Sequence, residues 1–298
     1  MNVVVSYVLS VYPEINAGGT ATSSSTITFL GIDGYGYFED GSNPSATQGY
    51  MQSNDIIYTL YGEDLRLPVD RNNTTSVTYL YKGSQTFTKA ITSSSTEVFE
   101  YIDATDSFEE RVTEDGGTYE ESSCLNSFLQ NNDLYLVDEI VLSTTPETKN
   151  VKVITLKECK YEPKKDSFIN LWGDLKDLWL FNKSVESMNV EKEFYKYNIL
   201  GYDGIYSTSN HVNRDFNVIG KESVTLSSGF LDEEYNKVFK EMMLSEKVWI
   251  TNITESGEQV LPINVKTGDI TYKTSLNDKL VQYTIEFDKS FDTINNIR

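Results

Sequence analysis

Histidine and cysteine are nearly absent from this chain of 298 residues, which contains one histidine and two cysteines. A zinc site built from these residue types needs about four ligands close together, and no cysteine lies near His211 in the sequence. A Ser-His-Asp triad would also have to use His211, whose neighbours show no nucleophile-elbow pattern. Cys124 and Cys159 are too few for a disulfide framework, so we expect free, buried thiols.

Basic residues are scarce as well, because 25 lysines and arginines stand against 45 aspartates and glutamates, a net charge of −20. Such a chain repels phosphate groups, which argues against free binding of nucleic acid. Residues 1–150 hold 22 acids and 6 bases, whereas residues 151–298 hold 23 and 19. The front part therefore carries the acidity. A solvated acidic surface is the simplest interpretation, with a basic partner or a cation site as alternatives.

The densest acidic stretch, residues 97–121, offers the remaining route to chemistry. Asp103, Asp106, Glu109 and Glu110 lie close in sequence, and a glycosidase needs only two carboxylates across a cleft. Nothing distinguishes two of the four, and their spacing lacks the alternating ligands and central glycine of a calcium-binding EF-hand loop. We therefore predict no catalytic residue, no cofactor and no metal site, and a protein that is not an enzyme.

Long hydrophobic runs are missing, and none approaches the roughly 18 apolar residues of a membrane helix. Residues 1–10 are apolar but lack a positively charged flank, so we interpret them as a first strand and not as a targeting segment. Gly31, Gly34 and Gly36 have turn spacing without the strand-turn-helix context of a dinucleotide fingerprint. The sequence predicts a soluble protein with no membrane partner.

β-forming sequence is what the front part has in quantity. Segments of period-two or β-branched character at 25–30, 55–60, 76–81, 85–90, 97–102 and 133–141 alternate with turn signals. Residues 76–90 predict a hairpin around Lys82, Gly83 and Ser84. Short strands at this spacing predict an acidic β-sandwich domain over residues 1–146, ending at a polar, proline-containing stretch.

The rear part, residues 147–298, is predicted as a β-rich domain with one helix near 231–245. Five apolar residues fall on one face of that helix: Leu231, Tyr235, Val238, Phe239 and Met242. Strands are expected at 151–159, 212–220, 223–226, 247–251, 260–265 and 281–287, with a turn at residues 202–204 before the strand at 212–220. The predicted fold class is mainly β, α+β overall, with an N-terminal β-sandwich followed by a β-rich domain whose amphipathic helix packs on a sheet.

Tryptophan occurs three times, and all three copies lie in the rear domain. Residues 167–181 predict an aromatic hairpin with a turn at Gly173 and Asp174. We consider Trp172, Trp179 and Trp249 candidate interface residues, because tryptophan is enriched at subunit contacts. A place in the core is the alternative for each of them.

The rear domain also contains an ordered series of segments that resembles tail-associated virion proteins of crAss-like phages, which infect Bacteroidota. The segments are Phe168–Gly173, Leu178–Ser187, Asp215–Glu222, Leu226–Phe230, Leu244–Trp249, Leu261–Lys266 and Tyr272–Leu280. The resemblance covers roughly residues 159–297, and the front domain carries no such pattern. The order of the series is more specific than any single segment.

This resemblance implies a structural subunit of a phage tail or head-tail junction, made in the host bacterial cytoplasm and located in the virion tail. It implies a homo-oligomeric ring around the DNA channel, attached to other tail or portal-proximal proteins, through which DNA passes without specific binding. Ring closure requires heterologous contacts between copies, and strand addition by the terminal strands is one candidate mode. The alternative function is a host-surface glycan-binding module of the tail, formed by the acidic β-sandwich.

Overall fold

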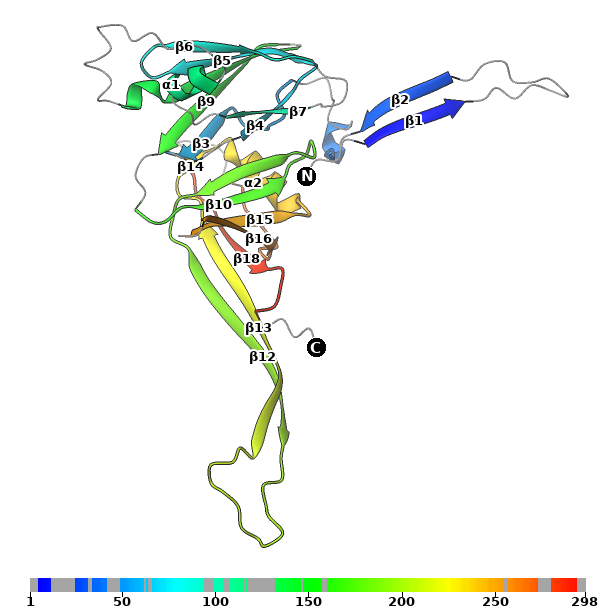
Figure 1. The fold of residues 1–298 in the computed structure, drawn as a ribbon, viewed down its shortest axis with the longest axis vertical. Coiled ribbons are helices and arrows are strands. Elements are labelled where there is room, and N and C mark those ends of the chain that lie inside the picture. Colours follow the sequence, from blue (N-terminus) through cyan, green and yellow to red (C-terminus); the bar gives the residue numbers. More distant parts are fainter. Residues whose placement is uncertain are drawn as a thin grey trace, which may run out of the picture. The chain divides into compact units, whose positions relative to one another are not determined.

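The structure of this protein is a computed structural model. It describes residues 5–11, 25–31, 34–41, 49–61, 63, 66–93, 99–103, 108–114, 116, 132–145, 147–156, 160–254, 257–272 and 280–293. Strands predominate over helices, which confirms the predicted mainly β, α+β class (Figure 1). Neither α1 (Phe108–Glu114), α2 (Tyr235–Leu244) nor any other described helix has the length and apolar character needed to cross a membrane.

Two compact units divide the chain, and neither is continuous in sequence. Unit 1 comprises residues 1–158, 167–179 and 232–246, and unit 2 comprises residues 159–166, 180–231 and 247–298. This division differs from the predicted domains 1–146 and 147–298, because a strand after residue 146 and the helix near 231–245 both group with the front part. Each unit is described by itself below.

Unit 1 contains a five-stranded sheet in the order β3-β9-β8-β5-β6 and a two-stranded sheet of β4 and β7. The strands are β3 (Ile56–Leu60), β4 (Arg66–Asp70), β5 (Thr74–Tyr81), β6 (Thr86–Ala90), β7 (Phe99–Asp103), β8 (Val137–Thr144) and β9 (Lys149–Leu156). β9 pairs antiparallel with β8 and parallel with β3, which places it inside the five-stranded sheet. β5 and β6 form the predicted hairpin.

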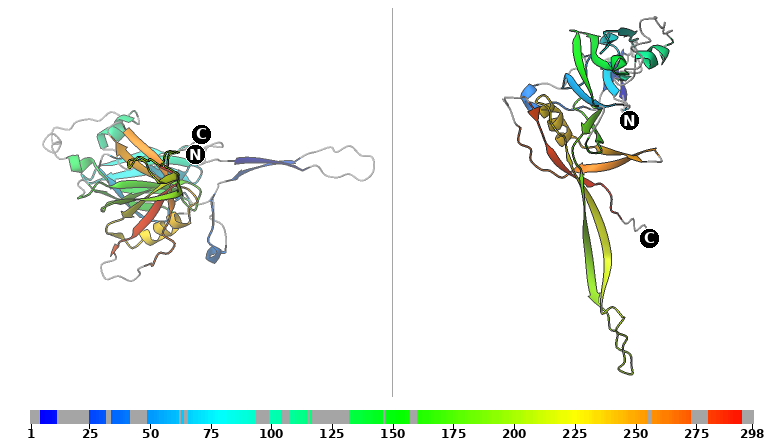
Figure 2. Two further views of the ribbon diagram at one scale, coloured as in Figure 1. Left: turned by 90° about the horizontal axis from the view of Figure 1, so that it is seen from below. Right: turned by 90° about the vertical axis from the view of Figure 1, so that its left-hand side faces the viewer.

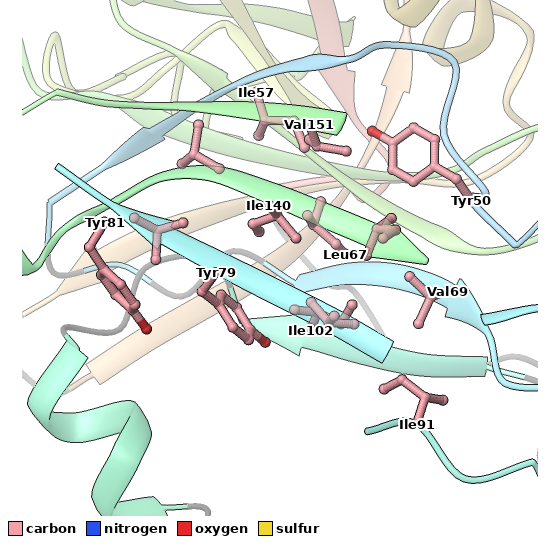
Figure 3. Packing of buried hydrophobic residues seen from close by; sticks show 14 residues of the cluster. Tyr50, Ile57, Leu67, Val69, Tyr79, Tyr81, Ile91, Ile102, Ile140 and Val151 are labelled. Atoms are coloured by element: carbon pink, nitrogen blue, oxygen red, sulfur yellow. The ribbon is translucent and has the colours of Figure 1, made fainter. Parts of the chain in front are cut away.

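One hydrophobic cluster joins both sheets of unit 1 (Figure 3). Leu67, Val69 and Ile102 come from the two-stranded sheet, and Tyr79 and Ile140 come from the five-stranded sheet. Burying each such side chain contributes about 1.5–3 kcal/mol. A shared core between two sheets is the arrangement that the predicted β-sandwich requires.

Unit 1 also contains helices α1 and α2 and six further elements. They are β1 (Val5–Val11), β2 (Ser25–Gly31), the short 3-10 helices η1 (Phe38–Asp40) and η2 (Asn132–Tyr135), and the hairpin of β10 (Lys164–Ile169) and β11 (Leu175–Leu180), most of which lies in this unit. β1 and β2 pair antiparallel. The β10–β11 turn has Gly173 at φ 78°, in the region that favours glycine, as the predicted aromatic hairpin requires.

Helix α2 buries its apolar face as predicted. Tyr235, Val238, Phe239 and Met242 are buried, and so is Leu231, which lies just before the helix in the short strand β14 (Leu231–Asp232). The Tyr235 hydroxyl accepts a hydrogen bond from the Tyr58 backbone N–H at 3.0 Å, which ties α2 to strand β3. This long-range contact is one of those that group α2 with unit 1, together with the Lys176–Glu241 and Lys240–Glu39 ion pairs.

Unit 2 is an antiparallel sheet in which β15, β16, β18, β13 and β12 follow one another in that order. Their bounds are β12 (Val185–Lys196), β13 (Asn213–Ser227), β15 (Val248–Thr254), β16 (Gly257–Val265) and β18 (Thr284–Lys289), with a short strand β17 (Leu280–Val281) before β18. Along β18, Ile285 and Phe287 are buried and alternate with more exposed residues. This alternation is typical of a sheet with one covered face.

Candidate subunit interface

Strands β12 and β13 continue as a two-stranded ribbon beyond the rest of their sheet (Figures 1 and 2). β18 pairs with β13 only from Ser223 to Ser227, whereas β12 pairs with β13 as far as Asn213. We call residues 185–222 the arm, with a shaft of residues 185–196 and 213–222 and a tip of residues 197–212. Every residue of β12 is exposed.

Contacts between its two strands hold the shaft together. Tyr195 and Phe216 meet edge to face with ring centroids 5.7 Å apart, and the Lys192 ammonium lies 2.6 Å from the Asp215 carboxylate. The pairing shifts register between Glu191 and Glu193, opposite Asn217 at φ 51°. Such a bulge increases local twist. Exposed ion pairs contribute about 0–1 kcal/mol each, so these contacts specify the register more than they stabilise the ribbon.

Large apolar side chains are exposed on both faces of the shaft. Cross-strand partners share a face, so Met188, Val190 and Phe194 lie on one face, and Tyr195 and Phe216 lie on the other. Phe194 exposes 70% of its surface. Contiguous exposed apolar residues on a soluble protein mark interaction surfaces. The shaft therefore offers two unpartnered faces.

The tip presents further apolar residues on an ordered turn. Gly201 donates its backbone N–H to the Ile205 carbonyl at 3.0 Å, and the Asp203 carboxylate accepts the Ile205 N–H at 3.1 Å. Gly204 adopts φ 76°, which favours glycine. The turn exposes 71% of Ile205 and leaves the Tyr202 side chain fully exposed. An ordered loop with exposed aromatic and aliphatic groups loses little conformational entropy when it binds.

The arm carries little net charge, although per residue it is about as acidic as the whole chain. Residues 185–222 hold six acids and four bases, a net charge of −2, in a chain of net charge −20. The tip contains one acidic residue, Asp203, and no lysine or arginine. Two arms that meet therefore add little repulsion of their own.

The C-terminal part of unit 2 fastens the base of the arm. Thr293 donates its backbone N–H to the Gly220 carbonyl at 2.8 Å and its hydroxyl to Glu222 at 3.1 Å. Lys289 forms an ion pair with Glu222. Hydrogen bonds from Lys289, the larger effect, and from Thr293 lower the pKa of Glu222. A pocket of 240 Å³ lies beside this cluster, lined by Glu186, Ser187, Met188, Glu222, Ser223, Val224 and Lys289.

The three tryptophans predicted as interface residues have different environments. Trp172 and Trp179 are buried within the single chain, as the core alternative proposed, and therefore offer no surface to a partner. Trp249 in β15 is partly exposed. Of the three predicted residues, Trp249 is the one with surface available for contact.

The other candidate residues from the sequence lie at the tip or mostly outside the described part of the chain. His211 is an exposed residue of the tip. Cys124, Cys159 and Asp106 lie outside the described residues, as do the side chains of Asp103 and Glu109. Within the described parts of the chain, no group of three or more histidine, cysteine, aspartate or glutamate side chains is placed to hold a metal ion.

One buried polar cluster of unit 1 was not anticipated from the sequence. The Lys176 ammonium of β11 lies 3.5 Å from the Glu241 carboxylate of α2 and donates a hydrogen bond to the Ser53 hydroxyl at 3.2 Å. The Lys176 and Glu241 side chains are 3% and 1% exposed. Burial lowers the pKa of Lys176, and the neighbouring Glu241 opposes this effect.

A serine next to a lysine is also the pair used by Ser-Lys hydrolases. That chemistry requires a lysine base within reach of a substrate, whereas the Lys176 side chain is 3% exposed and its ammonium lies against the buried Glu241 carboxylate. We therefore interpret the cluster as a structural ion pair between β11 and α2.

Sequence reasoning missed strand β12, one of the two strands of the shaft. A turn at residues 202–204 and a strand at 212–220 were predicted, and both lie in the arm. The predicted strand at 212–220 could have indicated β12. Its polar residues lie on both faces, yet a strand still needs a neighbouring strand to pair with. No family model, no curated protein and no solved structure matches this chain in comparisons with known proteins. We therefore infer the function from the residues of the arm.

Proposed function

We propose that the chain is a non-enzymatic structural subunit of a phage virion tail or head-tail junction. In this proposal copies form a ring around the DNA channel and attach neighbouring tail components. The observation that carries the proposal is the arm, a ribbon with exposed apolar residues on both faces and at its tip. The phage setting comes from the resemblance of residues 159–297 to tail-associated virion proteins.

The charge distribution supports this role. A chain of net charge −20 can surround DNA without binding its phosphates. The nearly neutral arm offers a surface on which like copies can meet. Because a ring needs two different patches on each copy, a surface with several unpartnered faces suits ring assembly better than a single patch does.

The test is the oligomeric state of the purified full chain. Sedimentation velocity over a 100-fold concentration range, with negative-stain imaging, is expected to show closed rings of one symmetry. A matched control deletes most of the arm: Ser187 is linked to Ser223, its cross-strand partner, by an Asn-Gly turn. We expect this control to fold and to remain monomeric.

Two results would contradict the proposal. One is a full chain that stays monomeric at every concentration and also fails to co-assemble with other tail proteins. The other is tight retention of duplex DNA by the purified protein at physiological salt, because the proposed channel must release DNA.

A further inference from the structure

We infer that neighbouring copies join by edge-to-edge strand pairing of their arms. The outer edge of β12 in one copy pairs with the outer edge of β13, from Asn213 to Ile219, in the next copy. The inference rests on the proposed ring and specifies the contact that closes it. The shafts then form one continuous antiparallel β structure around the ring.

Both edges are free in the described chain. β12 is the terminal strand of its sheet, and from Asn213 to Ile219 the strand β13 has β12 as its sole described strand neighbour. Thr293 occupies the outer side of β13 at Gly220, which sets the limit of the free edge. Backbone N–H and C=O groups along such edges template the pairing of another strand.

Hydrogen bonds at both ends of the shaft show which backbone groups point outward. The Gly220 carbonyl faces Thr293 and hence away from β12, so Val190, its partner, also directs its N–H outward. The Tyr197 N–H binds the Val212 carbonyl inside the ribbon at 2.7 Å. By alternation, Phe194 directs its N–H outward as well.

The shaft lacks the support that an ordered ribbon normally needs. An isolated two-stranded ribbon is marginally stable in water, yet β12 and β13 span 12 and 15 residues. No proline lies between Val185 and Ser227 to block either edge. The bulge at Asn217 adds the twist and curvature that closed β structures use.

A second copy of the chain is the partner that fits these edges. β12 and β13 are antiparallel, so adding β12 of one arm to β13 of the next continues the same alternation of strand direction. Each copy then contributes one edge of each kind, a heterologous contact that propagates until it closes. The shaft holds five acids and four bases, a net charge of −1, so adjacent shafts repel each other little.

The first test removes two outward N–H groups without changing the inner pairing. The double variant Val190→Pro/Phe194→Pro is compared, as full-length protein, with Val190→Ala/Phe194→Ala, which keeps both N–H groups. We expect the proline variant to need at least 10-fold higher concentration for ring formation, and the alanine variant to assemble near the wild-type concentration. Matching far-UV circular dichroism spectra verify that both variants fold.

Unchanged assembly of the proline variant overturns strand pairing and leaves the proposed ring intact. Equal loss of assembly in both variants also overturns it, because the side-chain faces would then carry the contact. A wild-type chain that never forms rings overturns the inference together with the proposed function.

The second test establishes which edges meet. In a Cys124→Ser/Cys159→Ser background, one chain carries Glu193→Cys and a second, longer-tagged chain carries Arg214→Cys, Phe216→Cys or Ile219→Cys. Each chain has one cysteine, so a disulfide can form only between copies. We expect a mixed disulfide for at least one pair. Its absence for all three, or disulfides that form only between two copies of the Glu193→Cys chain, refutes the heterologous pairing.

Discussion

The buried ion pair of Lys176 and Glu241 provides the sharpest test of how unit 1 is held together. We predict that Glu241→Gln and Lys176→Met each destabilise the protein severely, whereas the double variant nearly restores wild-type stability. Removing one partner leaves the other charge buried and uncompensated. Removing both leaves no buried charge.

The magnitude follows from the geometry of the pair. Unit charges 3.5 Å apart attract by about 5 kcal/mol at an effective dielectric constant of about 20. Losing one member of a buried pair costs about 3–5 kcal/mol, because the desolvated charge remains. We therefore expect a loss of about 3 kcal/mol or more for each single variant, and a change within about 1 kcal/mol for the double variant.

The assay is urea unfolding followed by tryptophan fluorescence in a Trp249→Phe background. The signal then comes from Trp172 and Trp179, which belong to the same unit as the ion pair. Asp55→Asn is the matched control, since its ion pair with Lys149 is shorter, at 2.8 Å, but the two side chains are 43% and 35% exposed. This control should cost about 1 kcal/mol or less. Additive single variants, with no coupling energy in the cycle, would refute the structural interpretation of the pair.

Three further predictions concern a buried carboxyl group, a close backbone contact and the tip. Burial raises the pKa of Asp166 well above its usual range. The neutral carboxyl therefore stabilises the folded protein at low pH, and this contribution is lost as the pH rises from about 4. Asp166→Asn should raise the urea midpoint at pH 7 and match wild type at pH 3. Gly34→Ala should cost about 1–3 kcal/mol in thermal unfolding, since a Cβ there would lie 2.5 Å from the Leu171 carbonyl oxygen. Tyr202→Ala should change stability by less than about 0.5 kcal/mol, yet reduce capture of partner proteins by an immobilised full chain; unchanged capture would exclude the tip as a contact.

Local sequence pattern was enough to predict helix α2 and the hairpins. Four of the five apolar residues at helical spacing lie on one buried face of α2, and the fifth, Leu231, is buried in β14. The turn residues around Gly83 join β5 and β6 as predicted. These features depend on residues close together in the chain, so periodicity alone contains most of the information.

The partners of these elements could not be read from the sequence. Tyr235 meets Tyr58 across 177 positions, and no local pattern specifies which sheet covers an apolar helix face. For the same reason the buried pair of Lys176 and Glu241 was invisible, because each residue alone resembles an ordinary surface charge. The division of the chain into units depended on such contacts.

Strand β12 escaped prediction because it is exposed on both sides. Val185–Lys196 mixes charged, polar and apolar residues on each face, so no period-two pattern of burial appears. β13 was predicted as two strands, 212–220 and 223–226, but it runs unbroken from Asn213 to Ser227. The most informative part of the candidate interface was thus half predicted, through the turn at its tip.

The interleaving of the two units has a consequence for synthesis on the ribosome. Unit 1 needs residues 232–246 to complete it, although its five-stranded sheet and the sheet of β4 and β7 are made of residues before 157. At about 20 residues per second, roughly 3 s pass between translation of residue 179 and residue 246. During that interval the site for α2 on β3 stays uncovered while the arm emerges. Slowing translation between these positions should therefore increase chaperone association of the nascent chain.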